Sequence, residues 1–237
     1  MLQSDVRNWA VIPAAGIGRR MGSSLPKQYL PLNGKTVLDN TLERLISHPR
    51  IDGVVVIIAE NDPHWQNSAF VSHPSVIMAT GGAERCHSVF NALEQLMNFA
   101  SAQDNVLVHD AARPCVRHED ITQLIIRAGM RADGGLLGMA VRDTMKRSDS
   151  NAKITSTVDR DGLWHAFTPQ LFRLELLHKA LEQALENEQL VTDDASAMEL
   201  AGFHPLMVEG AADNIKITRP EDLQLAAYYL QQQSGKS

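Results

Sequence analysis

Residues 9–21 read Trp-Ala-Val-Ile-Pro-Ala-Ala-Gly-Ile-Gly-Arg-Arg-Met, and Leu-Pro-Lys-Gln follows at residues 25–28. The apolar run 9–12 predicts a buried first strand. The glycines of the loop that follows allow its backbone to approach a ligand closely. Two arginines and Lys27 add positive charge to the same loop. A strand that leads into a glycine-bearing, cationic loop favours a triphosphate site.

This loop differs from the two best-known phosphate loops. A Walker loop needs Gly-x-x-x-x-Gly-Lys-Ser/Thr, which the stretch does not supply. A dinucleotide fingerprint needs a third glycine where this chain has Met21, and Pro26 disfavours a direct continuation into a helix. Glu60 follows the second apolar run, where a ribose-binding acid could lie. A nicotinamide-dependent oxidoreductase that uses Gly16 and Gly18 therefore remains an alternative.

Apolar strand patterns alternate with amphipathic helical patterns through the first half of the chain. The predicted strands are residues 54–59, 76–79 and 106–109, and the predicted helices are about residues 37–47, 85–99 and 121–131. This alternation predicts an α/β fold with a Rossmann-like, mostly parallel sheet flanked by helices. Ligands of such sheets bind beyond the carboxyl ends of the strands. The loops at Pro13, Gly81 and His109 follow predicted strands, so we expect them to form one site.

The segment 135–164 interrupts the alternation with short strand patterns and polar turns. We expect a single domain over residues 1–237 that carries an extended β arm at about residues 137–160. Because this arm has few residues for a core of its own, we expect it to pack on a second copy in a homodimer. The remaining elements are predicted as helices at 171–186 and about 194–201, a strand at 205–208, and a final helix from Pro220.

Composition excludes several other classes of protein. The chain has 237 residues, 44% of them apolar, which is enough for one large domain with a full core. Its net charge of −6 argues against a general nucleic-acid or membrane surface. Cys86 and Cys115 form no disulfide framework, and the sequence shows neither a signal peptide nor a membrane-spanning stretch. We therefore expect a cytoplasmic protein that binds neither nucleic acid nor membrane.

Asp110 is the strongest candidate for a metal ligand. It ends a predicted strand within the run His-Asp-Ala-Ala-Arg-Pro at residues 109–114. A carboxylate at the carboxyl end of a strand, beside a phosphate loop, is well placed to hold Mg²⁺. Arg113 is a candidate phosphate ligand, whereas His109 could be either a packed structural histidine or a catalytic one.

Other residues around this edge suggest nucleotide and phosphate contacts. Gly81 and Gly82 could expose backbone amides to a base edge, and Ser88 could add a hydroxyl group. Lys216 and Arg160 supply further cations. The run Thr-Asp-Asp at residues 192–194 predicts a helix cap. Neither zinc-ligand spacing nor a nucleophile elbow is present in the sequence, so the predicted chemistry is electrostatic.

Residues 13–21 and 26–29 together resemble the signature of the 2-C-methyl-D-erythritol 4-phosphate cytidylyltransferases of the non-mevalonate isoprenoid pathway. Further blocks resemble motifs of this family, in family order and over nearly the whole chain; they are residues 109–114, 141–147, 157–160, 163–164, 168–170 and 212–216. The first loop alone would indicate only a sugar-phosphate nucleotidyltransferase, and the later blocks make the resemblance specific.

The resemblance implies the reaction of CTP with methylerythritol phosphate to give the cytidine diphosphate alcohol and pyrophosphate. It implies that Arg20 and Lys27 stabilise the reacting α-phosphate and that Asp110 holds Mg²⁺. The implied nucleotide-binding residues are Ala14, Ala15, Gly16, Gly18, Gly81, Gly82, Arg85, Ser88 and Asp110. The implied residues around the sugar phosphate are Arg113, Thr144, Arg160, Thr168, Thr192, Asp213 and Lys216. In this family the β arm reaches across a homodimer, so Thr144 and Arg160 could serve the neighbour's site.

Two positions depart from the family pattern. Ala83 stands where an acidic residue often follows the paired glycines, and Asp194 stands where glutamate is common. Neither departure removes a cation or the expected metal ligand. A cytidylyltransferase for another polyol phosphate, such as ribitol 5-phosphate, and a non-catalytic nucleotide-binding regulator remain alternatives.

Overall fold

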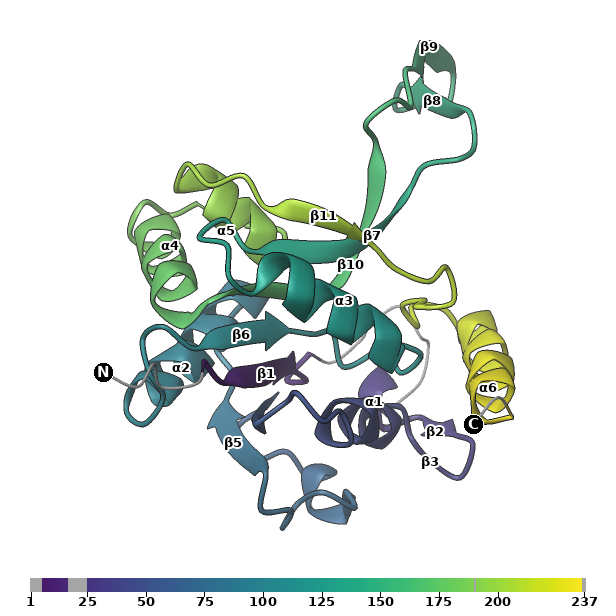
Figure 1. Cartoon of the computed structure of the whole chain (residues 1–237). Coiled ribbons are helices and arrows are strands. Elements are labelled where there is room, and N and C mark those ends of the chain that lie inside the picture. The colour runs from purple at the N-terminus through teal and green to yellow at the C-terminus, as the bar shows by residue number, and fades with distance from the viewer. Residues whose placement is uncertain (1–5, 17–24, 190, 236–237) are drawn as a thin grey trace.

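The computed structural model describes residues 6–16, 25–189 and 191–235 of the chain. A seven-stranded sheet runs through its centre in the order β11-β7-β10-β6-β1-β4-β5 (Figure 1). These strands are β1 (Asn8–Pro13), β4 (Gly53–Ile58), β5 (Val76–Thr80), β6 (Asn105–Val108), β7 (Gly135–Ala140), β10 (Trp164–Arg173) and β11 (Leu206–Glu209). Only β10 runs antiparallel to its neighbours within this sheet. The predicted mostly parallel α/β sheet is therefore confirmed.

The described helices agree closely with the predicted ones. They are α1 (Val37–Ile46), α2 (Arg85–Met97), α3 (His118–Ala128), α4 (Leu174–Glu186), α5 (Asp194–Leu200) and α6 (Pro220–Ser234). Shorter elements are the 3₁₀ turns η2 (Lys27–Tyr29) and η3 (Trp65–Asn67) and the small hairpin of β2 (Pro31–Leu32) and β3 (Lys35–Thr36). None of the helices in the described part of the chain has the length and apolar character needed to cross a bilayer.

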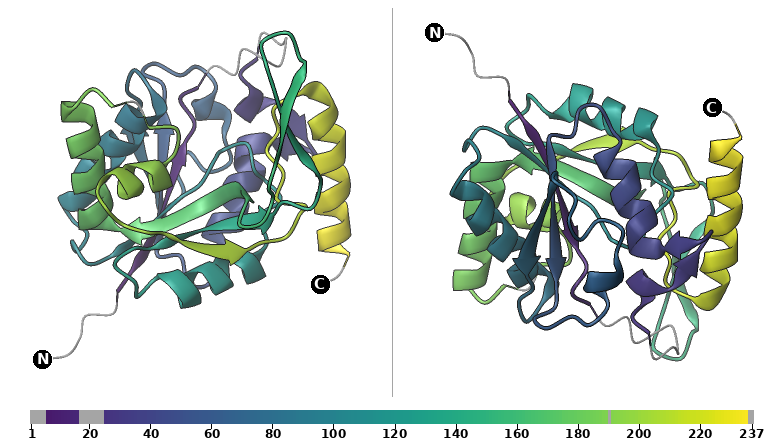
Figure 2. Two further views of the ribbon diagram at one scale, coloured as in Figure 1. Left: turned by 90° about the horizontal axis from the view of Figure 1, so that it is seen from above. Right: turned by 90° about the horizontal axis from the view of Figure 1, so that it is seen from below.

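Helices cover both faces of the sheet (Figure 2). The main core lies in two layers, one on each face of the sheet. Successive strand residues point to opposite faces. Val11 of β1 therefore packs in the layer under α2, α4 and α5, whereas Ala10 and Ile12 pack in the layer under α1 and α3. Strands buried on both faces explain the continuous apolar runs in the sequence.

The sequence patterns did not predict strand β10. A helix was predicted from Leu171, but residues 171–173 complete this strand, and α4 begins at Leu174. Leu171 is paired with Leu107 of β6, and Phe172 with Val106. The local pattern suits a helix, but long-range pairing with β6 and β7 overrides it.

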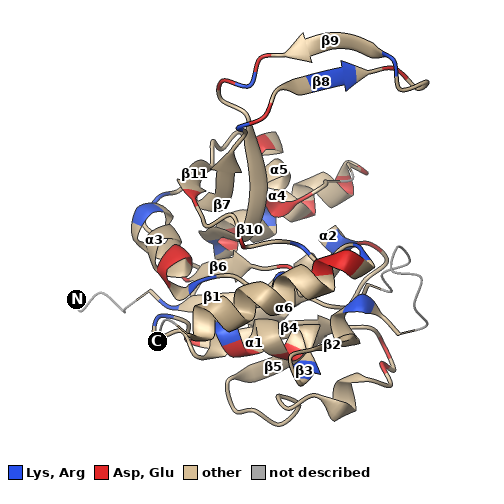
Figure 3. Cartoon of the chain, turned by 90° about the vertical axis from the view of Figure 1, so that its right-hand side faces the viewer, with Lys and Arg blue, Asp and Glu red and all other residues tan. Residues whose placement is uncertain are grey.

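The arm is a two-stranded ribbon of β8 (Met145–Ser148) and β9 (Ile154–Val158). It projects away from the sheet, and β8 carries basic side chains (Figures 1 and 3). Ile154 is 67% exposed, so its apolar side chain lacks a covering layer within this one chain. Residues 137–140, which we assigned to the arm, pair with β10 and β11 as part of β7.

The segment between β11 and α6 returns the chain to the carboxyl edge of the sheet. The amide of Ile217 donates to the carbonyl of Ala112 at 2.8 Å. Both residues belong to a small apolar cluster that also includes Leu230 of α6. This packing places Lys216 beside the loop that follows β6.

Candidate active site

The loops that follow β1, β5 and β6 meet at the carboxyl edge of the sheet around a cavity of about 290 Å³. The cavity is lined by Pro13, Ala15, Gly16, Gly82, Ala83, Glu84, Arg85, Ser88 and Asp110. Most of the predicted nucleotide-binding residues in the described part of the chain are in this set. The structure therefore brings the three loops together around one cavity at this edge, where the sequence predicted them to meet.

The described start of the first loop, at residues 14–16, is held by a buried glutamine. Gln28, which is 4% exposed, donates from Nε2 to the carbonyl of Ala14 at 2.5 Å and to that of Gly16 at 3.0 Å. The carbonyls of Ala14 and Gly16 are thus tied to η2, which fixes residues 14–16 beside the cavity. Gly18 and Arg20 lie outside the described residues.

The paired glycines allow a close approach of backbone segments. A Cβ atom at Gly81 would lie 2.5 Å from that of Ala15, so no side chain fits there. The expectation that both amides are exposed is wrong, because Gly81 donates to the carbonyl of Ile58 at 2.8 Å and Gly82 donates to Oγ of Ser88 at 3.0 Å. The hydroxyl group of Ser88 therefore closes this loop.

Asp110 lies at the centre of a cluster of cations. Its Oδ2 atom is 2.8 Å from Nζ of Lys216 and 3.4 Å from Nε of Arg113, and its Oδ1 atom is 3.8 Å from Nε of Arg85. Burial alone would raise the pKa of this carboxyl group. Attraction to Lys216, Arg85 and Arg113 outweighs burial and holds the pKa well below its usual value. Asp110 is therefore ionised across the physiological pH range.

His109 is a neutral, structural residue whose hydrogen bonds have a defined direction. It is fully buried, and burial lowers its pKa to about 4. Its Nε2 lies 3.0 Å from the carbonyl of Arg113 and must donate, so Nδ1 accepts from the hydroxyl group of Thr168 at 3.0 Å. The same Thr168 oxygen accepts the amide of Asp110 at 3.0 Å. This chain of hydrogen bonds fixes the backbone that presents the Asp110 carboxylate.

Arg113 connects three segments of the site. Its terminal nitrogen donates to the carbonyl of Asn214 at 2.7 Å, and its guanidinium lies over the ring of Phe167 at 5.1 Å from the centroid. Asn214 in turn donates from Nδ2 to the carbonyl of Thr168 at 2.9 Å. The turn that carries Lys216 is therefore held against β10 and the loop after β6. Nζ of Lys27 reaches the same turn and donates to the carbonyl at position 217 at 3.3 Å.

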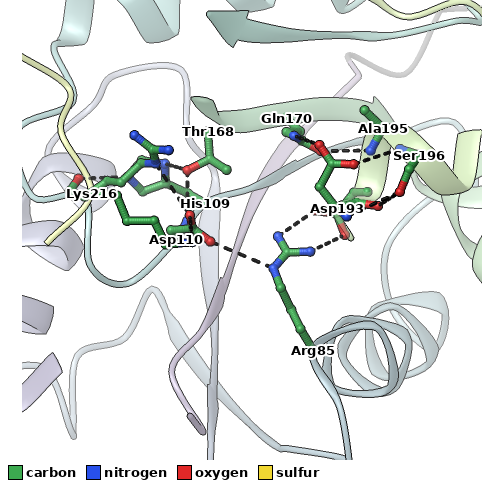
Figure 4. A network of polar contacts seen from close by, with 11 residues as sticks. Arg85, His109, Asp110, Thr168, Gln170, Asp193, Ala195, Ser196 and Lys216 are labelled. Atoms are coloured by element: carbon green, nitrogen blue, oxygen red, sulfur yellow. Dashed lines mark hydrogen bonds and ion pairs between the residues drawn. The ribbon is translucent and has the colours of Figure 1, made fainter. Parts of the chain in front are cut away.

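Arg85 forms the opposite side of the cluster (Figure 4). Its two terminal nitrogens bind the carboxylate of Asp194 at 3.1 and 2.7 Å. The predicted helix cap is confirmed: the side chain of Asp193 caps α5, and it also accepts from Nε2 of Gln170 at 2.8 Å. The amide of Ala195 donates to Oε1 of the same glutamine at 2.8 Å.

Other predicted sugar-phosphate residues lie apart from this cluster. Thr144 and Arg160 are exposed in the segments that connect β8 and β9 to the sheet, and Arg160 donates to the backbone carbonyl of Arg142. The carboxylate of Asp213 binds Arg117 at 2.6 to 3.1 Å and faces a separate cavity of about 280 Å³. Thr192 is exposed, just before the cap of α5.

Sequence reasoning gave Gln28, Gln170 and Asp194 no role in the active site, although all three shape it. Gln28 and Gln170 lie inside motifs that were recognised, which is the signal that could have identified them. Asp194 lies in a run for which only a helix cap was predicted, and no local pattern indicates its pairing with Arg85, which lies 109 residues away in the chain.

Comparison with known proteins agrees with this geometry. The family model for 2-C-methyl-D-erythritol 4-phosphate cytidylyltransferase matches residues 9–232. The chain is 54% identical over 227 residues to a protein of that name from Aeromonas hydrophila, an alignment that covers 96% of this chain and 91% of the relative. A crystal structure of a 4-diphosphocytidyl-2C-methyl-D-erythritol synthase matches with a TM-score of 0.84 and 40% identity, over 95% of this chain and 98% of that one. The corresponding cytidylyltransferase structure from Francisella tularensis matches with a TM-score of 0.82 and 40% identity, over 94% and 99% of the two chains. From its motifs, its fold and these matches, the chain belongs to the 2-C-methyl-D-erythritol 4-phosphate cytidylyltransferase family.

Proposed function

We propose that this enzyme transfers CMP from CTP to the phosphate of 2-C-methyl-D-erythritol 4-phosphate, giving 4-diphosphocytidyl-2-C-methyl-D-erythritol and pyrophosphate in isoprenoid precursor biosynthesis. The proposal rests on the placement of Asp110, which lines the cavity, among the cations of Lys216, Arg113 and Arg85 in a chain of this family.

The proposed reaction requires charge control rather than proton transfer. An oxygen of the acceptor phosphate attacks the α-phosphorus of CTP, and the bond from that phosphorus to the bridging oxygen of the β-phosphate breaks. The attacking oxygen is already anionic at neutral pH, so no general base is needed. The neutral, buried His109 accordingly supports the backbone of the site rather than moving a proton.

Lys27 and Arg20 are proposed to stabilise charge on the reacting α-phosphate. Lys27 lies beside the turn of Lys216, so the two ammonium groups approach the site from the same side. Cations that are fixed before the reaction stabilise developing charge without the cost of reorganising solvent. We assign Lys216 and Arg113 to the acceptor phosphate and the Gly81–Ser88 loop to the cytidine.

The residues at this edge fit a bound Mg²⁺. Asp110 is ionised and lines the cavity, and Mg²⁺ commonly binds through one or two carboxylates together with substrate phosphates and waters. In the described residues no three His, Cys, Asp or Glu side chains gather as a metal site, which agrees with a metal that arrives with the triphosphate. Such a metal would neutralise phosphate charge.

We further propose that the enzyme is a homodimer in which the arm of each copy covers the neighbour's site. The exposed apolar side chain of Ile154 on the arm, and the position of Thr144 and Arg160 in the exposed segments that join the arm to the sheet, support this arrangement. The cytoplasmic location expected from the sequence remains part of the proposal. Cys86 and Cys115 are buried and form no disulfide.

Pyrophosphate release tests the reaction and its substrates together. We expect release with Mg²⁺, CTP and methylerythritol phosphate, and little with UTP or ATP. Release with ribitol 5-phosphate but not with methylerythritol phosphate would keep the chemistry and overturn the proposed acceptor. The nicotinamide alternative is not favoured by the family match, and Glu60 does not line the cavity.

A further inference from the structure

Asp194 is a buried carboxylate with no role in the reaction described above. Its side chain is 1% exposed and binds both terminal nitrogens of Arg85, at 3.1 and 2.7 Å. A bidentate pair, in which two guanidinium N–H groups bind the two oxygens of one carboxylate, fixes the orientation of the guanidinium as well as its position. A residue at the start of α5 thereby determines where an arginine of α2 lies.

Arg85 has a second carboxylate within reach. Its Nε is 3.8 Å from Oδ1 of Asp110, beyond hydrogen-bond distance. The other oxygen of Asp110 is engaged by Lys216 at 2.8 Å and approached by Arg113 at 3.4 Å. Oδ1 of Asp110 thus faces the Arg85 guanidinium without a hydrogen bond between them (Figure 4). Both residues line the cavity.

The anchor that holds Arg85 is rigid. Asp193 accepts the amide of Ser196 at 3.0 Å and the side chain of Gln170 at 2.8 Å, so the first turn of α5 is tied to β10. Gln170 is paired with Val108 of β6, two residues before Asp110. Asp194 is therefore held at a fixed distance from Asp110 and cannot follow Arg85 toward it.

We infer that Asp194 is a positioning residue that holds the Arg85 guanidinium away from Asp110 and so leaves Oδ1 of Asp110 available to the metal–nucleotide complex. The inference rests on the proposed function, in which Asp110 holds the metal. Without the charge at position 194, Asp110 is the carboxylate to which Arg85 can turn. A movement of about 1 Å would create a charge-assisted hydrogen bond that competes with a divalent cation.

The test measures CTP binding by calorimetry with the acceptor absent, in Mg²⁺ and again in EDTA. The ratio of the two affinities isolates the contribution of the metal. Asp194→Asn should lower this ratio by about tenfold, the factor expected for one competing charge-assisted hydrogen bond. Asp194→Glu keeps the charge and should retain most of the ratio. The double variant Arg85→Gln/Asp194→Asn should recover it, because the competing guanidinium is gone.

If Asp194→Asn does not fold, two variants of Arg85 test the inference with Asp194 left in place. Arg85→Lys keeps the positive charge but cannot form the bidentate pair with Asp194. Its ammonium group can therefore turn to Asp110, and the ratio of the CTP affinities in Mg²⁺ and in EDTA should fall. Arg85→Gln removes the competing cation, so its ratio should not fall below that of the wild type, whatever its effect on the affinity for CTP itself. Equal ratios for these two variants, an unchanged ratio in folded Asp194→Asn, or a loss that persists in the double variant would each overturn the inference. If the affinity of the wild-type enzyme for CTP does not respond to Mg²⁺, both the proposed metal site and this inference are wrong. If the wild-type affinity responds to Mg²⁺ but the variants do not show the expected changes, the inference alone is wrong.

Discussion

Replacing Thr168 with valine should destabilise the protein far more than replacing it with serine. The hydroxyl group of Thr168 accepts the Asp110 amide and donates to Nδ1 of His109, both at 3.0 Å. Valine has the same shape but no hydroxyl group, so it leaves both partners without this bond. Thr168 is 5% exposed and His109 is 0% exposed, so water cannot easily replace the lost group.

The loss of stability comes from two polar groups left without a hydrogen-bond partner, the amide of Asp110 and Nδ1 of His109. A buried polar group without a partner costs about 1–3 kcal/mol, and the two together give about 3 kcal/mol after allowance for the partial exposure of Asp110. Serine keeps the hydroxyl group and loses one methyl group, which costs about 1 kcal/mol. With a urea m-value of about 3 kcal/mol/M, the midpoint of Thr168→Val should fall by about 1 M and that of Thr168→Ser by about 0.3 M.

Urea unfolding followed by circular dichroism measures both shifts, and turnover is measured on the same samples. Turnover of Thr168→Val should also fall, because the backbone that presents Asp110 loses its restraint. If the valine and serine variants unfold at the same urea concentration, the hydrogen bonds that join Thr168 to His109 and to the Asp110 amide do not contribute to the free energy of unfolding. The proposed support of the site backbone would then be wrong.

Three further outcomes are expected. Lys27→Ala should lower kcat by about 10²–10³-fold with an unchanged circular dichroism spectrum, because one fixed cation near the reacting phosphate is lost; near-normal turnover would remove Lys27 from the mechanism. Arg160→Ala should chiefly raise KM for methylerythritol phosphate, and a rise in KM for CTP instead would refute our division of the site. The lowered pKa of His109, about 4, means that the unfolded chain binds a proton first as pH falls. The free energy of unfolding should therefore be insensitive to this group above pH ~6.5 and should fall by up to about 3 kcal/mol between there and pH ~4. Urea titrations should show a smaller fall in His109→Asn, and an identical fall in both proteins would exclude His109 as its source.

Local sequence patterns predicted the parallel part of the sheet well. The apolar runs that became β1, β4 and β6 are buried on both faces, so each is continuous and easy to recognise. β10 escaped because its identity depends on pairing with β6 and β7, and because Leu171 also continues the helical pattern of α4. Propensity alone cannot decide between a strand end and a helix start at such a position.

The site was predictable in its cations and carboxylate but not in its supports. Asp110 and Lys216 were both recognised, and the structure brings them to 2.8 Å. The bonds of Gln170 and Asp194 depend on distances between elements that are far apart in the chain. Paired glycines signal close backbone approach, yet they do not reveal that Ser88 already uses the amide of Gly82.

Asp110 is proposed to direct Mg²⁺-dependent cytidylyl transfer. The most direct test compares pyrophosphate release from CTP and methylerythritol phosphate by the wild-type enzyme and Asp110→Asn over a range of Mg²⁺ concentrations. We expect wild-type release that requires Mg²⁺, and a loss of about 10³-fold or more in the variant with an unchanged circular dichroism spectrum. Comparable release by the folded variant, or wild-type release that persists in EDTA, would contradict the account.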